Sequence, residues 1–165
     1  MYQWNSSILD LTHSRAFRTF VNLQPYESST MEGPTLKKVL PVVLLSAVWI
    51  AVSEFLRNEF VLKSHWITHY RSMGLEFPSA PVNGMVWGIW SICFAVLIVA
   101  LGKRNSMPMT AIIAWFSGFP LMWLVLGNLM VLPYDILPIA VPWSMVEVLG
   151  ASYIVHKLGG FDGNK

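Results

Sequence analysis

The sequence predicts an all-α fold: a polytopic membrane protein whose four transmembrane helices form a bundle and are kinked. Hydrophobic residues make up 55% of the chain and charged residues 12%, against roughly 25% charged residues in soluble domains. A hydrocarbon core about 30 Å thick needs about 20 helical residues, and lipid cannot hydrogen-bond backbone amides, so long apolar stretches must be helical. The four stretches of this length are residues 39–56, 82–101, 109–132 and 136–158.

These stretches define a transmembrane domain, residues 35–158, with a segment on either side. Residues 1–34 mix polar and scattered apolar side chains, and residues 159–165 form a short tail. The first segment lacks the continuous apolar core and the cleavage site of a signal peptide. We predict a flexible or interfacial extension, and two interpretations stay open. Residues 1–30 are a dispensable or misassigned extension, or they form an amphipathic helix on the membrane surface.

The first predicted helix, residues 39–56, carries an acidic residue near its outer end. Glu54 lies about 22 Å along the helix axis from Val39, and Arg57 follows at the spacing that allows an ion pair. Two interpretations remain open for this pair. It belongs to a polar site at the mouth of a pocket, or its side chains extend to the lipid headgroups.

Two histidines follow the first helix in an HxxxH pattern. If that helix continues without a break, Glu54, Asn58, His65 and His69 form a polar stripe on one face. The HxxxH spacing is also that of metal ligands, but the sequence offers no third ligand nearby except Glu76. His65 and His69 are therefore weak metal candidates, with an acid–base role and a plain interfacial position as alternatives.

The second predicted helix, residues 82–101, has a polar and aromatic face near its outer start. Asn83, Trp87 and Trp90 share this face and are candidates for the walls of a pocket. A second face consists of small residues, which in membranes favours close approach of two helices. We expect an intrachain contact there that Gly88→Leu would disrupt. The small residues of this face are Gly84, Gly88, Ser91 and Ala95.

The third and fourth predicted helices each contain an internal proline. Pro120 and Pro142 each remove a backbone hydrogen bond and should kink their helices. The kinks either shape helix packing alone or also open a cavity or hinge. Asn128 adds a polar group at the outer end of the third helix.

Glu147 is the most informative polar residue of the fourth helix. It lies about 18 Å along the axis from Asp135, near the bilayer midplane. A carboxylate at that depth costs about 2.5 to 3.5 kcal/mol on the lower scales, so we expect Glu147 to face the bundle interior and to be partnered or protonated. Ser144 shares its face. A functional and a purely structural role are both open.

The polar residues gather in the outer halves of the helices, whereas the inner halves are nearly all apolar. This one-sided pattern predicts an outward-facing intramembrane pocket for binding or transporting a small molecule or a lipid headgroup. The alternatives are a membrane accessory or assembly subunit without a ligand of its own, and a membrane-embedded enzyme that uses Glu and His residues. The candidate ligand-binding residues are Glu147, Glu54, Arg57, Asn83, Trp87, Trp90, Asn128 and Ser144.

The distribution of positive charge predicts the orientation of the chain. Lysine and arginine are more frequent on the side that holds both termini, so we expect both termini in the cytoplasm and the segment 63–78 outside. The layout resembles that of small four-helix membrane proteins of bacteria, which implies the bacterial inner membrane. The net charge of +2 is too small to indicate nucleic-acid binding, and no motif indicates a cofactor. The lipid bilayer is the expected partner, and a second copy or another membrane protein remains an option.

Overall fold

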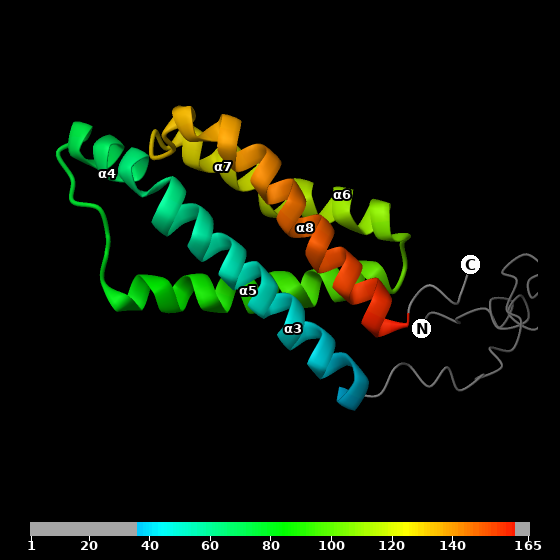
Figure 1. Ribbon diagram of the computed structural model, residues 1–165. Coiled ribbons are helices and arrows are strands. Elements are labelled where there is room, and N and C mark those ends of the chain that lie inside the picture. The colour runs from blue at the N-terminus through cyan, green and yellow to red at the C-terminus, as the bar shows by residue number, and fades with distance from the viewer. Residues whose placement is uncertain (1–35, 161–165) are drawn as a thin grey trace, which may run out of the picture. The chain divides into compact units, whose positions relative to one another are not determined.

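The computed structural model describes residues 36–160, so the predictions for the N-terminal extension and for most of the tail lie outside the described residues. With the labels of Figure 1, the helical elements follow one another without a strand between them in this part of the chain. They are α3 (Leu36–Phe55), the π-helix η1 (Leu56–Val61), α4 (Lys63–Ser72), α5 (Pro81–Gly102), α6 (Met107–Gly118), α7 (Pro120–Asn128), the 3-10 helix η2 (Tyr134–Ile136) and α8 (Leu137–Gly159).

Four helical segments are long and apolar enough to cross a membrane, which confirms the predicted fold class. Three of them match the predicted stretches closely. The third ends at Asn128 and not at Leu132, because Met130 adopts a left-handed backbone conformation (φ 58°) that an α-helix cannot contain. The four segments are Leu36–Val61, Pro81–Gly102, Met107–Asn128 and Tyr134–Gly159.

Successive spans run in opposite directions, so each end of the bundle collects a defined set of segments (Figure 1). We call the end that carries α4, the start of α5 and the 129–136 segment the α4 end. The opposite end carries the start of α3 and the turn between α5 and α6. The span α3 packs against both α5 and α8, and α6 packs against α5 and α8.

The core of the bundle is mainly apolar, and toward the end opposite α4 it also buries the polar residues Ser46, Thr110, Ser152 and His156. Ile50, Ile98, Ala114 and Val148 have no solvent-exposed surface and belong to one cluster contributed by all four spans. By contrast, neither α4 nor α7 contains a fully buried residue. At the α4 end the core is a second, smaller buried cluster, and partly buried side chains of α4 and α7 pack against it. Its members are Leu62, Leu132, Ile136 and Ala140.

Large apolar side chains cover the outside of the helices. Val48 is 59% exposed, Ile89 61% and Leu124 70%, and each points away from the core. Soluble proteins rarely present so much continuous apolar surface. Lipid tails are the environment that matches this surface, which supports a multi-pass membrane protein.

The prolines act as the sequence predicts, but with different strength. Pro120 divides the third span, because helix α6 ends at Gly118 and α7 begins at Pro120, with Phe119 between them at φ −116° and ψ −65°. Pro142 lies inside α8 without ending it. The break is modest, because the amides of Phe119 and Trp123 keep α-helical hydrogen bonds and Met107–Asn128 remains one span.

The predicted close contact at Gly88 is wrong. A Cβ atom added at Gly84 or Gly88 would meet nothing within 4 Å, whereas one added at Gly150 would come within 2.6 Å of the Trp49 ring and one at Gly118 within 2.6 Å of the Phe94 ring. Close packing is thus made by glycines of α8 and α6 against aromatic rings. The start of α5 stands apart from its neighbours, and sequence spacing alone does not reveal which small residues are covered.

Candidate functional site

A buried ion pair marks the junction of α3 and η1. Arg57 is 4% exposed and its Nη2 donates to Glu54 Oε1 over 2.5 Å, while Glu54 is 3% exposed. The pairing predicted from the three-residue spacing is confirmed, and burial excludes the interpretation in which both side chains extend to the headgroups. The Arg57 guanidinium also lies over the Phe119 ring, 5.4 Å from its centroid, where the electron-rich face attracts a cation.

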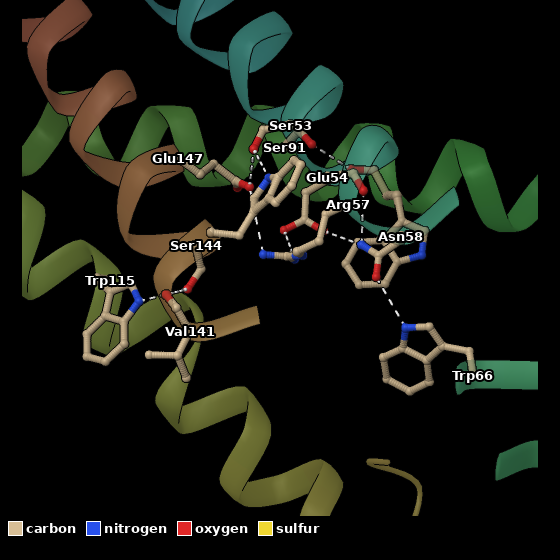
Figure 2. A network of polar contacts seen from close by, with 12 residues as sticks. Ser53, Glu54, Arg57, Asn58, Trp66, Ser91, Trp115, Val141, Ser144 and Glu147 are labelled. Carbon is tan, nitrogen blue, oxygen red and sulfur yellow. Dashed lines mark hydrogen bonds and ion pairs between the residues drawn. The ribbon is translucent and has the colours of Figure 1, made fainter. Parts of the chain in front are cut away.

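Asn58 extends the pair toward α4. Its Nδ2 donates to Glu54 Oε2 over 2.8 Å and to the Glu54 backbone oxygen over 3.0 Å. Its Oδ1 accepts a hydrogen bond from Trp66 Nε1 over 3.2 Å. Both Glu54 oxygens therefore have donors, and the network connects the first span to α4 (Figure 2).

Glu147 enters the same network from α8, as Figure 2 shows. It is fully buried, so the prediction that it faces the bundle interior is confirmed. Ser53 Oγ donates to Glu147 Oε2 over 2.8 Å, and Arg57 Nη1 lies 3.9 Å from the same oxygen. Two tryptophans fix this contact: Trp143 Nε1 donates to Ser53 Oγ over 3.1 Å, and Trp49 Nε1 donates to the Glu147 backbone oxygen over 2.8 Å.

The network is not saturated by its own members. Two nitrogens of Arg57, Nε and Nη1, and one oxygen of Glu147, Oε1, are buried without a hydrogen-bond partner among the described residues. Buried polar atoms without partners are uncommon in folded proteins and call for an explanation. The buried group also contains two carboxyl groups and one guanidinium, so acids outnumber bases at its centre.

The predicted polar stripe along one continuous helix is wrong, because the helix changes type after Phe55. In η1 the Leu62 amide donates to the Arg57 carbonyl oxygen, five residues earlier, which is the π-helical pattern. This extra residue in the turn rotates α4 relative to α3, and the histidines face a different part of the molecule from Glu54.

The two histidines attach α4 to the segment before α8. His65 Nδ1 donates to Asp135 Oδ2 over 2.6 Å, and His69 Nε2 donates to the Met130 backbone oxygen over 3.0 Å. A shallow hollow of about 350 Å³ lies beside them. Within residues 36–160, no three His, Cys, Asp or Glu side chains are arranged to hold a metal ion. The lining of this hollow is Ser64, His65, Thr68, His69, Ser72 and Asp135.

Two further cavities lie at the α4 end, on either side of the polar network. The α3–α5 cavity has a volume of about 350 Å³ and includes Glu54, Glu59 and Gly88 in its lining. The α4–α7 cavity has a volume of about 340 Å³ and includes Arg57 and Trp123. Both volumes fall within the range of small-molecule sites. The cavities adjoin, since they share the lining residues Asn58, Phe77, Pro78, Asn83 and Trp87.

The cavities bring together only some of the residues selected from the sequence. Glu54, Arg57, Asn83 and Trp87 line one cavity or both. Glu147 and Ser144 are fully buried behind them and are absent from both linings; Ser144 Oγ accepts from Trp115 Nε1 over 2.9 Å.

The other two selected residues lie elsewhere. Trp90 stacks on Phe94 in the aromatic part of the core, with ring centroids 4.8 Å apart. Asn128 is exposed at the end of α7 and is absent from both linings.

Several lining residues are not among the selected candidates. Trp66, Tyr70 and Trp123 contribute aromatic surface to the α4–α7 cavity, and Phe77 covers both cavities from the loop before α5. The aromatic residues of α4 could have been found from the sequence, because tryptophan and tyrosine favour membrane interfaces and so indicate the α4 end. Nothing in the local sequence marks Phe77, whose position depends on how the loop folds back.

Comparisons of this chain with protein-family models, with curated proteins and with solved structures found no match.

Proposed function

We propose that this membrane protein binds a small polar molecule or a lipid headgroup in the two adjoining cavities at the α4 end. The observation that carries the proposal is the buried Glu54–Arg57 pair, whose two members line these cavities, together with two Arg57 nitrogens that have no hydrogen-bond partner among the described residues. Mostly apolar walls with a few convergent polar groups are typical of ligand sites.

The geometry favours binding over the two alternatives. An accessory subunit whose polar groups only pair with one another needs no cavity beside them. Here the two cavities have volumes of about 350 and 340 Å³. An acid–base enzyme requires the histidines and the glutamates to converge, whereas His65 and His69 contact Asp135 and Met130. Transport would additionally need a path to the opposite end through the buried cluster that includes Ile98 and Val99.

The first test fills the α3–α5 cavity without disturbing the fold. Gly88→Leu adds a side chain where a Cβ meets nothing within 4 Å, so we expect normal folding. Bound molecules are measured by native mass spectrometry of the full chain purified in a mild non-ionic detergent. We expect the parent protein to retain a noncovalently bound molecule and Gly88→Leu to retain clearly less of it, with an affinity at least about tenfold weaker.

Ala100→Leu is the matched control, because it enlarges an exposed small residue on the same helix away from both cavities. It should retain the bound molecule like the parent. Equal occupancy in Gly88→Leu and the parent, or a parent without any bound molecule, would contradict the proposed function.

We further propose that the protein resides in the cell membrane with both termini in the cytoplasm, so that the α4 end faces outward. The support is the excess of lysine and arginine on the side of the termini. In a Cys93→Ser background, Leu75→Cys should react with a membrane-impermeant maleimide in intact cells, whereas Lys103→Cys should react only after lysis. Both positions are exposed. The reverse labelling pattern would invert the assignment.

A further inference from the structure

We propose that the ligand of these cavities is a zwitterion, with its cationic end in the α3–α5 cavity and its anionic end in the α4–α7 cavity. This inference rests on the proposed function and specifies the chemistry of its ligand. The shared chemistry is an ammonium-type cation joined to a phosphate or carboxylate, either as the headgroup of a lipid or as a free molecule.

The charged residues of the two linings have opposite signs. The α3–α5 cavity is lined by Glu54 and Glu59 and contains no lysine, arginine or histidine among its lining residues. The α4–α7 cavity is lined by Arg57 and contains no acidic residue. Because the cavities adjoin at Asn58 and Asn83, one molecule that spans this boundary meets a negative wall on one side and a positive wall on the other.

On the positive side, two nitrogens of Arg57 have hydrogens to donate but no acceptor among the described residues. Arg57 is only 4% exposed, and its Nε and Nη1 have no hydrogen-bond partner in the described part of the chain. Arginine binds phosphate and carboxylate groups through two N–H groups at once. Arg57 lines the α4–α7 cavity, so an anionic group there meets its positive charge, and a shift of the guanidinium toward the cavity would let one of the buried nitrogens donate to that group.

The walls on the negative side suit an organic cation. Phe55, Phe77 and Trp87 line the α3–α5 cavity together with the two glutamates. Aromatic faces attract ammonium and quaternary ammonium groups, most strongly when water is excluded. Aromatic rings beside carboxylates are therefore the combination that this end of the ligand requires.

Charge balance favours a zwitterion over a simple ion. Arg57 already pairs with Glu54 inside the bundle, so an anion alone would add an unpaired charge. A cation alone would also add an unpaired charge and would leave the Arg57 nitrogens without acceptors. A zwitterion adds no net charge and serves both groups.

The test compares five probes on the full chain in a non-ionic detergent, with the shift in melting temperature as the readout of binding. Three are soluble: glycerophosphocholine carries both charges, choline the cation and glycerol phosphate the anion. Two are lipids: phosphatidylcholine is zwitterionic and phosphatidylglycerol anionic. We expect a saturable rise in melting temperature with the zwitterions alone. A response to phosphatidylcholine but not to glycerophosphocholine identifies a lipid ligand, and a response to both identifies the headgroup chemistry as sufficient.

A surface variant locates the cation. Glu59 side-chain Oε1 pairs with Lys63 Nζ over 2.8 Å, and only Glu59 lines the cavity. Glu59→Gln should weaken zwitterion binding by about 3- to 10-fold, whereas Lys63→Gln, which breaks the same pair, should leave it unchanged. Both side chains are at least 40% exposed, so both variants should fold.

Other outcomes separate the two proposals. If choline, glycerol phosphate or phosphatidylglycerol stabilises the protein as well as the zwitterions do, the zwitterion assignment is overturned and the binding function stands. If no probe raises the melting temperature but Gly88→Leu still loses the co-purified molecule, the ligand belongs to another chemical class. The zwitterion assignment is then overturned and the binding function stands. Equal effects of Glu59→Gln and Lys63→Gln would also overturn the placement of the cation.

Discussion

Arg57→Met is expected to destabilise the bundle by about 3 to 5 kcal/mol, the largest effect of any single substitution that we predict here. The guanidinium lies 2.5 Å from Glu54 and 3.9 Å from Glu147, and both carboxyl groups are buried. Removing it leaves two neighbouring acids inside the membrane without a positive partner. The measurement is reversible unfolding of the full chain in mixed micelles with increasing sodium dodecyl sulfate, followed by circular dichroism.

A second variant distinguishes loss of charge compensation from loss of packing. Adding Glu54→Gln to Arg57→Met removes one of the stranded acids while keeping the shape of the side chain, so stability should recover by about 1 kcal/mol or more. Asn58, which also contacts Glu54, remains as a partner for the new amide. If Arg57→Met unfolds within about 1 kcal/mol of the parent, or if the double variant shows no recovery, the pair is not a source of stability.

Gly150→Leu should be the second most damaging change, at about 1 to 3 kcal/mol. Even a Cβ at this position would lie 2.6 Å from Cε2 of the Trp49 ring. The ring cannot simply move aside, because Trp49 Nε1 donates to the Glu147 backbone oxygen over 2.8 Å. Displacing it separates α3 from α8 beside the polar network. Thermal unfolding in detergent should show a melting temperature lower by about 3 °C or more.

Ala100→Leu provides the control for this measurement, since it introduces the same side chain at an exposed position of another transmembrane helix, outside both cavities. Its melting temperature should stay close to that of the parent. Should Gly150→Leu and Ala100→Leu melt alike, the close contact between Gly150 and the Trp49 ring would have no energetic meaning.

Features that depend on position along one helix were predictable from the sequence. The depth of Glu147 in its apolar stretch was enough to predict burial, and it is fully buried. The spacing of Glu54 and Arg57 was enough to predict their ion pair. The break in the third span follows in the same way from the missing amide of Pro120. Each of these statements uses only helix geometry and the cost of polar groups in lipid.

Features that depend on contacts between distant segments were not predictable. Ser53 is 94 residues away from Glu147 along the chain, and no local pattern links the two. The small-residue face of α5 was identified, but only its Ser91 and Ala95 are buried, while Gly84 and Gly88 border a cavity. Which part of a packing face is covered depends on how the helices cross, and that is decided by the whole bundle.

The π-helical turn η1 has a consequence for how the site varies among homologous chains. A π turn holds one residue more than the α-helical turn it replaces. Deleting one residue between Leu56 and Val61 would restore a continuous α-helix and rotate α4 by about 100° relative to α3. Trp66 would then lose Asn58, and His65 would lose Asp135. A single-residue gap in this turn of an aligned homologue would therefore mark a chain without the α4 wall of the cavity, whatever else the two sequences share.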